Sequence, residues 1–269
     1  MMACDTGELI VIADLPKTLN EVSGIEVAGD SISVWMLNDG GNKAKLYRLD
    51  QKGKIKHELK IDAKNHDWED LTTDDHGNLY IGDFGNNYSD RKNLVILKVK
   101  YDYLESFADV PIERISFRYP KQNKFPPKKK QLYYDSEAFF FFNDSLYVFT
   151  KSRVKGNFGR TDLYKIPAKQ GQHVATYIDS FTSCDKLECW ITAADISDDG
   201  KKVVLLTHRS AWIFTDFKGD AFFKGNAQEH LFGHESQKES VCFKTNDLLL
   251  IADEKGHGAG GNLYEFNLN

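Results

Sequence analysis

Residues 69–83 read EDLTTDDHGNLYIGD, two short runs rich in apolar and β-branched residues on either side of a polar turn. The turn combines aspartate, glycine and asparagine, which supply the backbone conformations needed between antiparallel strands. The stretch therefore predicts a β-hairpin. Similar turn signals separate apolar runs at residues 143–145, 197–200 and 245–247, and no stretch keeps a helical apolar period over three turns.

The hairpin belongs to a repeat that runs through the whole chain. Five segments begin alike, and the successive starts are 46, 68, 55 and 47 residues apart: Ser23, Glu69, Glu137, Thr192 and Glu239. This spacing is close to the roughly 40–50 residues of a β-propeller blade. Second strands follow at residues 32–37, 79–82, 146–149, 203–207 and 248–252, and third strands at 45–49, 94–99, 162–166, 211–215 and 262–266. The first four units add a fourth candidate strand, at 56–61, 113–118, 176–181 and 229–232.

The fifth unit lacks a fourth strand, and the apolar run at residues 7–13 can supply it. Such a pairing would close the sheets into a ring with few exposed edges. We therefore predict an all-β fold in which residues 1–269 form a single β-propeller domain of four-stranded antiparallel blades, closed by the N-terminal strand. The repeat count favours five blades, with six as an alternative. Two packed sheets with Greek-key connections are the other architecture that the strands allow.

Charge and composition exclude several classes of protein. Lys and Arg number 35 against 40 Asp and Glu, a net charge of −5, which argues against general nucleic-acid binding. The longest apolar runs fall far short of the roughly 20 residues that span a bilayer, so we expect no transmembrane segment. We also expect a monomer.

The cysteines bear on location. Cys4 follows Met2 and Ala3, which resembles the end of a bacterial lipoprotein signal, and an ordinary start of the chain is the alternative. We expect a periplasmic, cell-surface or secreted protein, with a cytoplasmic location as the alternative. Cys184 and Cys189 form either a disulfide in an exposed loop or two free thiols, and Cys242 suits a buried position.

Blade geometry predicts where polar residues meet. The inner strand of each blade starts at the face of the disc where the second strand ends, so both positions converge on the mouth of the central channel. The second strands end at Asp39, Asp83, Lys151, His208 and Asp253. The carboxylates at these positions are candidate ligands of a hard cation such as calcium, which takes about six to eight oxygens: Glu69, Glu137, Glu239, Asp83, Asp39 and Asp253. Solvated acidic turn residues are the alternative.

Basic residues are predicted beside this acidic ring. Lys151, Arg153, His208 and Arg209 lie in equivalent loops of the third and fourth units, and Lys129 belongs to the basic run at residues 121–130. These five are the candidate binding residues for a small-molecule anion. A solvated linker is the alternative for the lysine run.

Two segments carry a family resemblance. NHDWEDL at residues 65–71, followed by DHGNLYIGDFGNN at 75–87, resembles a group of uncharacterised secreted bacterial β-propellers, and ADISDDGKK at 194–202 is similar to their fourth blade. More remotely, the strand starts resemble the metal-binding entry strands of gluconolactonase-type and phytase-like propellers. That resemblance implies a divalent cation at the channel mouth and, in some members, ester hydrolysis. Those families are described as six-bladed, whereas five units are counted here.

Two functions follow as hypotheses. The first is a module that binds a small-molecule anion or a protein ligand, with calcium at the channel mouth. The second is a cation-dependent hydrolase of phosphate or carboxylic esters, in which His208 and Asp83 are the candidate catalytic residues.

Overall fold

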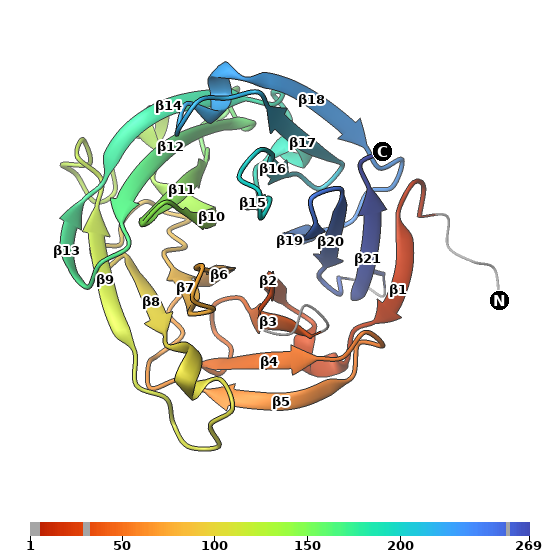
Figure 1. Cartoon of the computed structure of the whole chain (residues 1–269). Coiled ribbons are helices and arrows are strands. Elements are labelled where there is room, and N and C mark those ends of the chain that lie inside the picture. Colours follow the sequence, from red (N-terminus) through yellow and green to blue (C-terminus); the bar gives the residue numbers. More distant parts are fainter. Residues whose placement is uncertain (1–5, 29–32, 257–258) are drawn as a thin grey trace.

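Five antiparallel blades surround a central channel, which confirms the predicted all-β propeller and its count of five blades (Figure 1). The structure, a computed structural model, describes residues 6–28, 33–256 and 259–269. Cys4, on which the expected lipoprotein anchor depends, lies outside the described residues. Among the described residues, no helix is long and apolar enough to cross a membrane.

Each blade has four antiparallel strands arranged from the channel outward, and blade 2 gains a fifth at its outer edge. Blade 1 contains β2 (Val22–Val27), β3 (Val34–Asn38), β4 (Lys45–Leu49) and β5 (Ile55–Lys60). Blade 2 contains β6 (Trp68–Thr73), β7 (Leu79–Asp83), β8 (Val95–Val99) and β9 (Glu113–Arg118). Blade 3 contains β10 (Asp135–Phe142), β11 (Ser145–Lys151), β12 (Arg160–Pro167) and β14 (Thr176–Thr182). Blade 4 contains β15 (Ala193–Ile196), β16 (Val203–Leu206), β17 (Ser210–Thr215) and β18 (Asn226–Leu231).

Blade 5 closes the ring with the N-terminal strand, as predicted. It contains β19 (Lys238–Thr245), β20 (Leu248–Asp253), β21 (Asn262–Asn267) and β1 (Ile10–Asp14). Ile10 pairs with Glu265 and Asp14 with Asn262, so the first described strand is hydrogen-bonded to the last. Short 3-10 helices lie in the connections: η1 (Lys17–Leu19), η2 (Tyr101–Tyr103), η3 (Lys129–Gln131), η4 (Leu187–Cys189) and η5 (Phe222–Lys224).

One strand was not foreseen. β13 (Gly171–Val174) leaves blade 3 between β12 and β14 and pairs in parallel with β9 at the outer edge of blade 2. Its residues GQHV carry a single large apolar side chain, which leaves little strand signal in the sequence. Because of this crossover, blade 2 has five strands, the fifth contributed by blade 3.

Apolar side chains hold neighbouring blades together. The buried residues form five clusters, each shared between adjoining blades. Trp35 of β3 and Ile81 of β7, for example, belong to one cluster, and Phe140 of β10 and Leu205 of β16 to another. The many aromatic residues therefore fill the spaces between blades.

Polar side chains bond the inner strand of one blade to that of the neighbouring blade. The amide nitrogen of Phe139 donates to Asp70 Oδ2 at 3.0 Å, and that of Phe243 donates to Asp195 Oδ2 at 2.7 Å. The Thr192 hydroxyl donates to the Lys238 carbonyl of the next blade at 2.7 Å. These bonds satisfy inner-edge backbone groups that have no strand partner on the channel side.

Removing residues 1–14 tests the closure of the ring. This change deletes β1, leaves the edge of β21 unpaired and exposes the cluster that buried Leu9 joins. We expect the melting temperature to fall by about 10 °C or more, because each lost kcal/mol lowers it by about 2–4 °C in a domain of this size. A chain that lacks only residues 1–5 is the control. An unchanged melting temperature after removal of residues 1–14 would contradict the closure.

Candidate functional site

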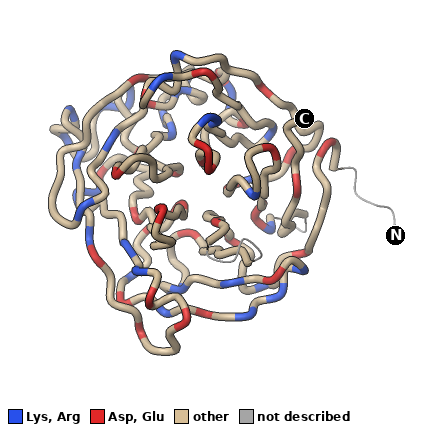
Figure 2. The backbone as a smooth tube through the Cα atoms, viewed as in Figure 1, with Lys and Arg blue, Asp and Glu red and all other residues tan. Residues whose placement is uncertain are grey.

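A polar cavity of about 140 Å³ lies where the inner strands begin and the second strands end. Residues from blades 1, 2, 3 and 5 line it: Ser23, Asp39, Glu69, Asn87, Glu137, Lys151, Arg153, Gln237, Glu239 and Glu254. The fold thus brings together four of the six expected cation ligands and two of the expected anion-binding residues at the channel mouth. Acidic segments also recur around the opposite, hairpin end of the channel, which faces the viewer in Figure 2.

Three carboxylates at this mouth lie close enough to share one ion. Asp39, Asp67 and Glu69 each offer an oxygen, and these oxygens lie within 4.8 Å of one another. Asp39 follows β3, while Asp67 and Glu69 lie at the start of β6. Asn65 fixes the two segments relative to each other, because its Nδ2 donates to the Asp39 carbonyl at 2.8 Å and its Oδ1 accepts from the Trp68 amide at 3.0 Å.

Two glycines make room for these carboxylates. A Cβ atom at Gly85 would clash with Glu69 Oε1 and Asp67 Oδ2, and one at Gly40 would clash with Asp67 Oδ1. Arg91 holds the Gly85 loop in place by donating to the Gly85 carbonyl at 2.6 Å and to Asp83 Oδ1 at 2.7 Å. Glycine at these positions therefore allows the side-chain oxygens to approach the backbone closely.

The basic residues of the mouth are paired with carboxylates. Lys151 Nζ lies 2.5 Å from Glu137 Oε2. Arg153 contacts Asp135 Oδ2 at 2.6 Å and Glu137 Oε1 at 3.0 Å. These two cations are therefore largely neutralised by Glu137 and Asp135. No ion pair joins a basic residue of the described ranges to Asp39, Asp67 or Glu69.

A disulfide-closed loop covers this basic pair. Cys184 and Cys189 are bonded, which resolves the two alternatives for these cysteines. The loop ends at Trp190, whose Nε1 donates to the Ser152 carbonyl at 2.7 Å. The Trp190 ring lies 4.7 Å from the Arg153 guanidinium and 5.1 Å from Lys151 Nζ. The indole thus holds both basic side chains against their carboxylates.

Burial raises the pKa values of several carboxylates at the mouth, whereas for Glu239 the charge of Lys151 and the hydrogen bond from His208 outweigh burial and lower the pKa. Burial, together with the charges of Asp67 and Glu239, raises the pKa of Asp39 to about 6. Burial, with Glu239 and Asp39 nearby, raises the pKa of Glu254 to about 8. The pKa of Glu69 lies well above its usual range, again through burial first and then through Glu137 and Asp39. Negative charge at this mouth exceeds what the nearby bases neutralise, a condition that a bound cation relieves.

Other expected site residues lie outside the cavity. Asp83 is buried and bonded to Arg91 and to His66 Nδ1, the latter at 3.1 Å. Asp253 accepts from the Asn262 amide and the Tyr264 hydroxyl, both at 2.8 Å, and so closes a turn.

His208 lies at the rim of the cavity, with Nε2 3.0 Å from Glu239 Oε1. Arg209 faces Glu229 of β18 at 3.4 Å, and Lys129 lies in η3.

Strand register explains why Asp83 and Asp253 differ from Asp39. Asp83 and Asp253 pair with Trp68 and Lys238, and the residue in the same position of blade 1 is Asn38, which pairs with Val22. Asp39 is therefore one position further along, where blade 5 has Glu254. Counting residues between strands did not reveal this shift, because the hairpins differ in length: Val27 pairs with Val34 in blade 1 and Thr73 with Leu79 in blade 2, while blade 5 has a second β-bulge before its turn. The expected cation ligands did not include Asp67 and Glu254, although both lie close in sequence to residues that were expected.

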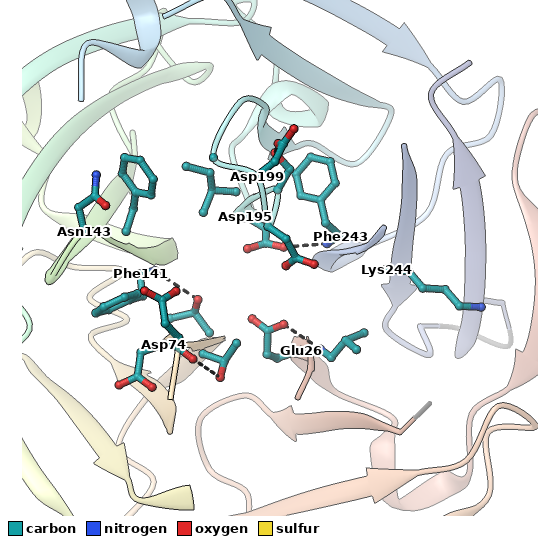
Figure 3. Close-up of a pocket in the computed structure, with 17 residues that line it drawn as sticks. Glu26, Asp74, Phe141, Asn143, Asp195, Asp199, Phe243 and Lys244 are labelled. Carbon is teal, nitrogen blue, oxygen red and sulfur yellow. Dashed lines mark hydrogen bonds between the residues drawn. The ribbon is translucent and has the colours of Figure 1, made fainter. Parts of the chain in front are cut away.

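A larger cavity of about 580 Å³ occupies the opposite end of the channel, beside the inner hairpins (Figure 3). Glu26 and Asp195 point into it, but Glu26 Oε1 accepts from the Val27 amide at 2.8 Å and Asp195 from the Phe243 amide. Asp74 is paired with Lys98 at 3.1 Å, and Lys244 points away toward Glu265. Glu26 and Asp195 thus accept backbone amides, whereas the mouth holds the cluster of three carboxylates, so we take the smaller cavity as the candidate site.

No protein-family model matches the chain, and no curated protein matches it. Solved structures resemble it in fold. A gluconolactonase from Xanthomonas campestris has a TM-score of 0.53 at 12% identity, over 93% of this chain and 73% of its own. The PQQ-bound aldose sugar dehydrogenase from Streptomyces coelicolor has a TM-score of 0.52 at 14% identity, over 96% and 97% of the two chains. At such low identity these likenesses show that the chain has the propeller fold.

Proposed function

We propose that the channel mouth binds a divalent cation, calcium, and that the propeller is a ligand-binding or interaction module. The observation that carries this proposal is the cluster of Asp39, Asp67 and Glu69, whose oxygens lie within 4.8 Å of one another. Carboxylate oxygens are the ligands that calcium prefers. The glycines at positions 40 and 85 support the proposal, since they leave the space that these side chains occupy.

The charge of the remaining mouth supports a cation ligand over a free anion. Lys151 and Arg153 are already paired with Glu137 and Asp135. An anionic ligand would therefore bind through the cation, with these bases at its side. The Cys184–Cys189 disulfide supports an extracytoplasmic location, because disulfides persist in oxidising compartments.

Calcium should stabilise the parent protein, because an ion that binds only the folded state adds to the free energy of unfolding. We expect millimolar calcium to raise the melting temperature by several degrees, about 2–4 °C for each kcal/mol of binding free energy. The substitution Glu69→Gln should remove this increase, because it removes one ligand charge. Gly85→Ala should weaken calcium binding at least tenfold, because its methyl group displaces Glu69 and Asp67.

Two variants control for nonspecific effects. Glu58→Gln removes an exposed carboxylate of β5, and Gly156→Ala adds a methyl group that meets no neighbouring atom, at a glycine whose φ of +84° makes the substitution strain the backbone. Both should keep the calcium response of the parent. The proposal fails if calcium, magnesium and a chelator all give the same melting temperature.

The pH dependence of stability gives an independent test. The pKa values of Asp39 and Glu254, about 6 and about 8, lie above those of an unfolded chain. Such groups stabilise the fold at low pH, and this contribution is lost as pH rises through the folded-state pKa values. With a chelator present, the melting temperature should therefore fall between pH 5.5 and 7.5. The window ends there because Lys238, whose pKa burial lowers to about 8, acts in the opposite direction above it.

Calcium should reduce that fall, since it takes the place of the protons on the carboxylates. Its affinity, measured by isothermal titration calorimetry, should rise over the same pH range. An affinity that is flat with pH would contradict the protonation of these carboxylates in the cation-free protein.

A cation-dependent hydrolase is the second candidate function, and one contact favours it. His208 Nε2 lies 3.0 Å from Glu239 Oε1 at the rim of the same cavity, an arrangement in which the carboxylate orients a histidine that can accept a proton from a cation-bound water. Turnover of aryl phosphate or acetate esters should then require calcium and should fall at least a hundredfold in His208→Ala and Glu69→Gln. Equal turnover in parent and variants would reject this function while leaving cation binding untouched.

A further inference from the structure

A strongly basic segment joins β9, the fourth strand of blade 2, to β10, the inner strand of blade 3. Residues 115–134 contain Arg118 and five lysines, at positions 121, 124, 128, 129 and 130, and no Asp or Glu, in a chain whose net charge is −5. None of these six side chains forms an ion pair with any residue that the structure describes. The surface around residues 115–134 therefore carries positive charge that no ion pair with a described residue neutralises.

The crossover strand β13 builds a groove on this face. A cavity of about 420 Å³ lies across β8, β9 and β13, and its lining contains no carboxylate. Lys92, Arg118 and His173 contribute its basic side chains. Lys92 also lies 5.2 Å from the Phe125 ring, and Lys121, in the segment that follows Arg118, lies 6.0 Å from the Tyr177 ring of β14. Figure 2 shows Lys and Arg segments along the rim where β9 and β13 lie.

β13 also offers a backbone edge. It is the last strand of its sheet and pairs on one side only, with β9, in the part of the chain that the structure describes. Gln172 is exposed and Val174 is 47% exposed beside that edge. An edge strand of this kind can accept a further strand, whose main-chain hydrogen bonds supply affinity and whose side chains supply specificity.

We propose that the basic face, defined as Lys92, Arg118, Lys121 and His173 around the groove, binds an extended acidic peptide segment of a partner protein. The peptide adds a strand to β13 and places its carboxylates among these four residues. Charge complementarity selects an acidic partner, and the free edge of β13 selects an extended peptide among anionic partners. This interaction is separate from the cation proposed at the channel mouth.

Fluorescence anisotropy with a labelled peptide of alternating Glu and Val tests the proposal on the full chain. We expect binding that weakens as salt rises, because exposed ion pairs are screened. The triple variant Lys92→Ala/Arg118→Ala/Lys121→Ala should bind at least tenfold more weakly at an unchanged melting temperature, since all three side chains are exposed. Lys52→Ala/Lys54→Ala, on exposed lysines of the blade 1 hairpin, should bind as the parent does.

Matched ligands separate the two parts of the proposal. A Glu–Pro peptide of equal charge lacks every second amide donor and should bind much more weakly, and a chelator should change nothing. Equal binding of both peptides would overturn strand addition. Equal or tighter binding of anionic phosphatidylglycerol vesicles or of a sulfated polysaccharide would overturn the assignment to a peptide, as would a triple variant that binds like the parent.

Discussion

The inner edge of each blade is the constraint on which the rest of this structure depends. Five strands turn backbone amides and carbonyls toward a channel in which no neighbouring strand pairs with them, and buried groups of this kind need partners. Asp70, Thr72 and Asp195 supply acceptors for the next blade, and Ser23 and Thr192 supply donors. Polar residues in the channel are thus first a requirement of the fold.

That requirement distinguishes the two ends of the channel. At the hairpin end, Glu26 and Asp195 accept backbone amides, and their carboxylates are committed to the architecture. At the mouth, Asp39, Asp67 and Glu69 lie together, while Lys151 and Arg153 are engaged by Glu137 and Asp135. The proposed site is therefore at the smaller cavity, because its carboxylates form a cluster whose oxygens can meet at one point.

Repetition made the fold predictable from sequence, because each blade repeats one local hairpin whose turn residues are visible. The closure by the N-terminal run was predictable for the same reason, since blade 5 lacked a strand. Residues at the strand starts, such as Glu69 and Glu137, followed from the repeat. Glu254 did not, because a β-bulge moves the facing position by one residue. β13 was missed because its pairing partner lies in another blade and its own residues are polar.

The pairing of β1 with β21 has a consequence for synthesis. During translation the N-terminal strand emerges first, and its partner, Asn262–Asn267, emerges about 250 residues later. Blades 1 to 4 can pair their strands as they leave the ribosome, whereas β1 remains without its partner until Asn262–Asn267 has been made. Until β1 and β21 pair, an open strand edge is available to other nascent chains.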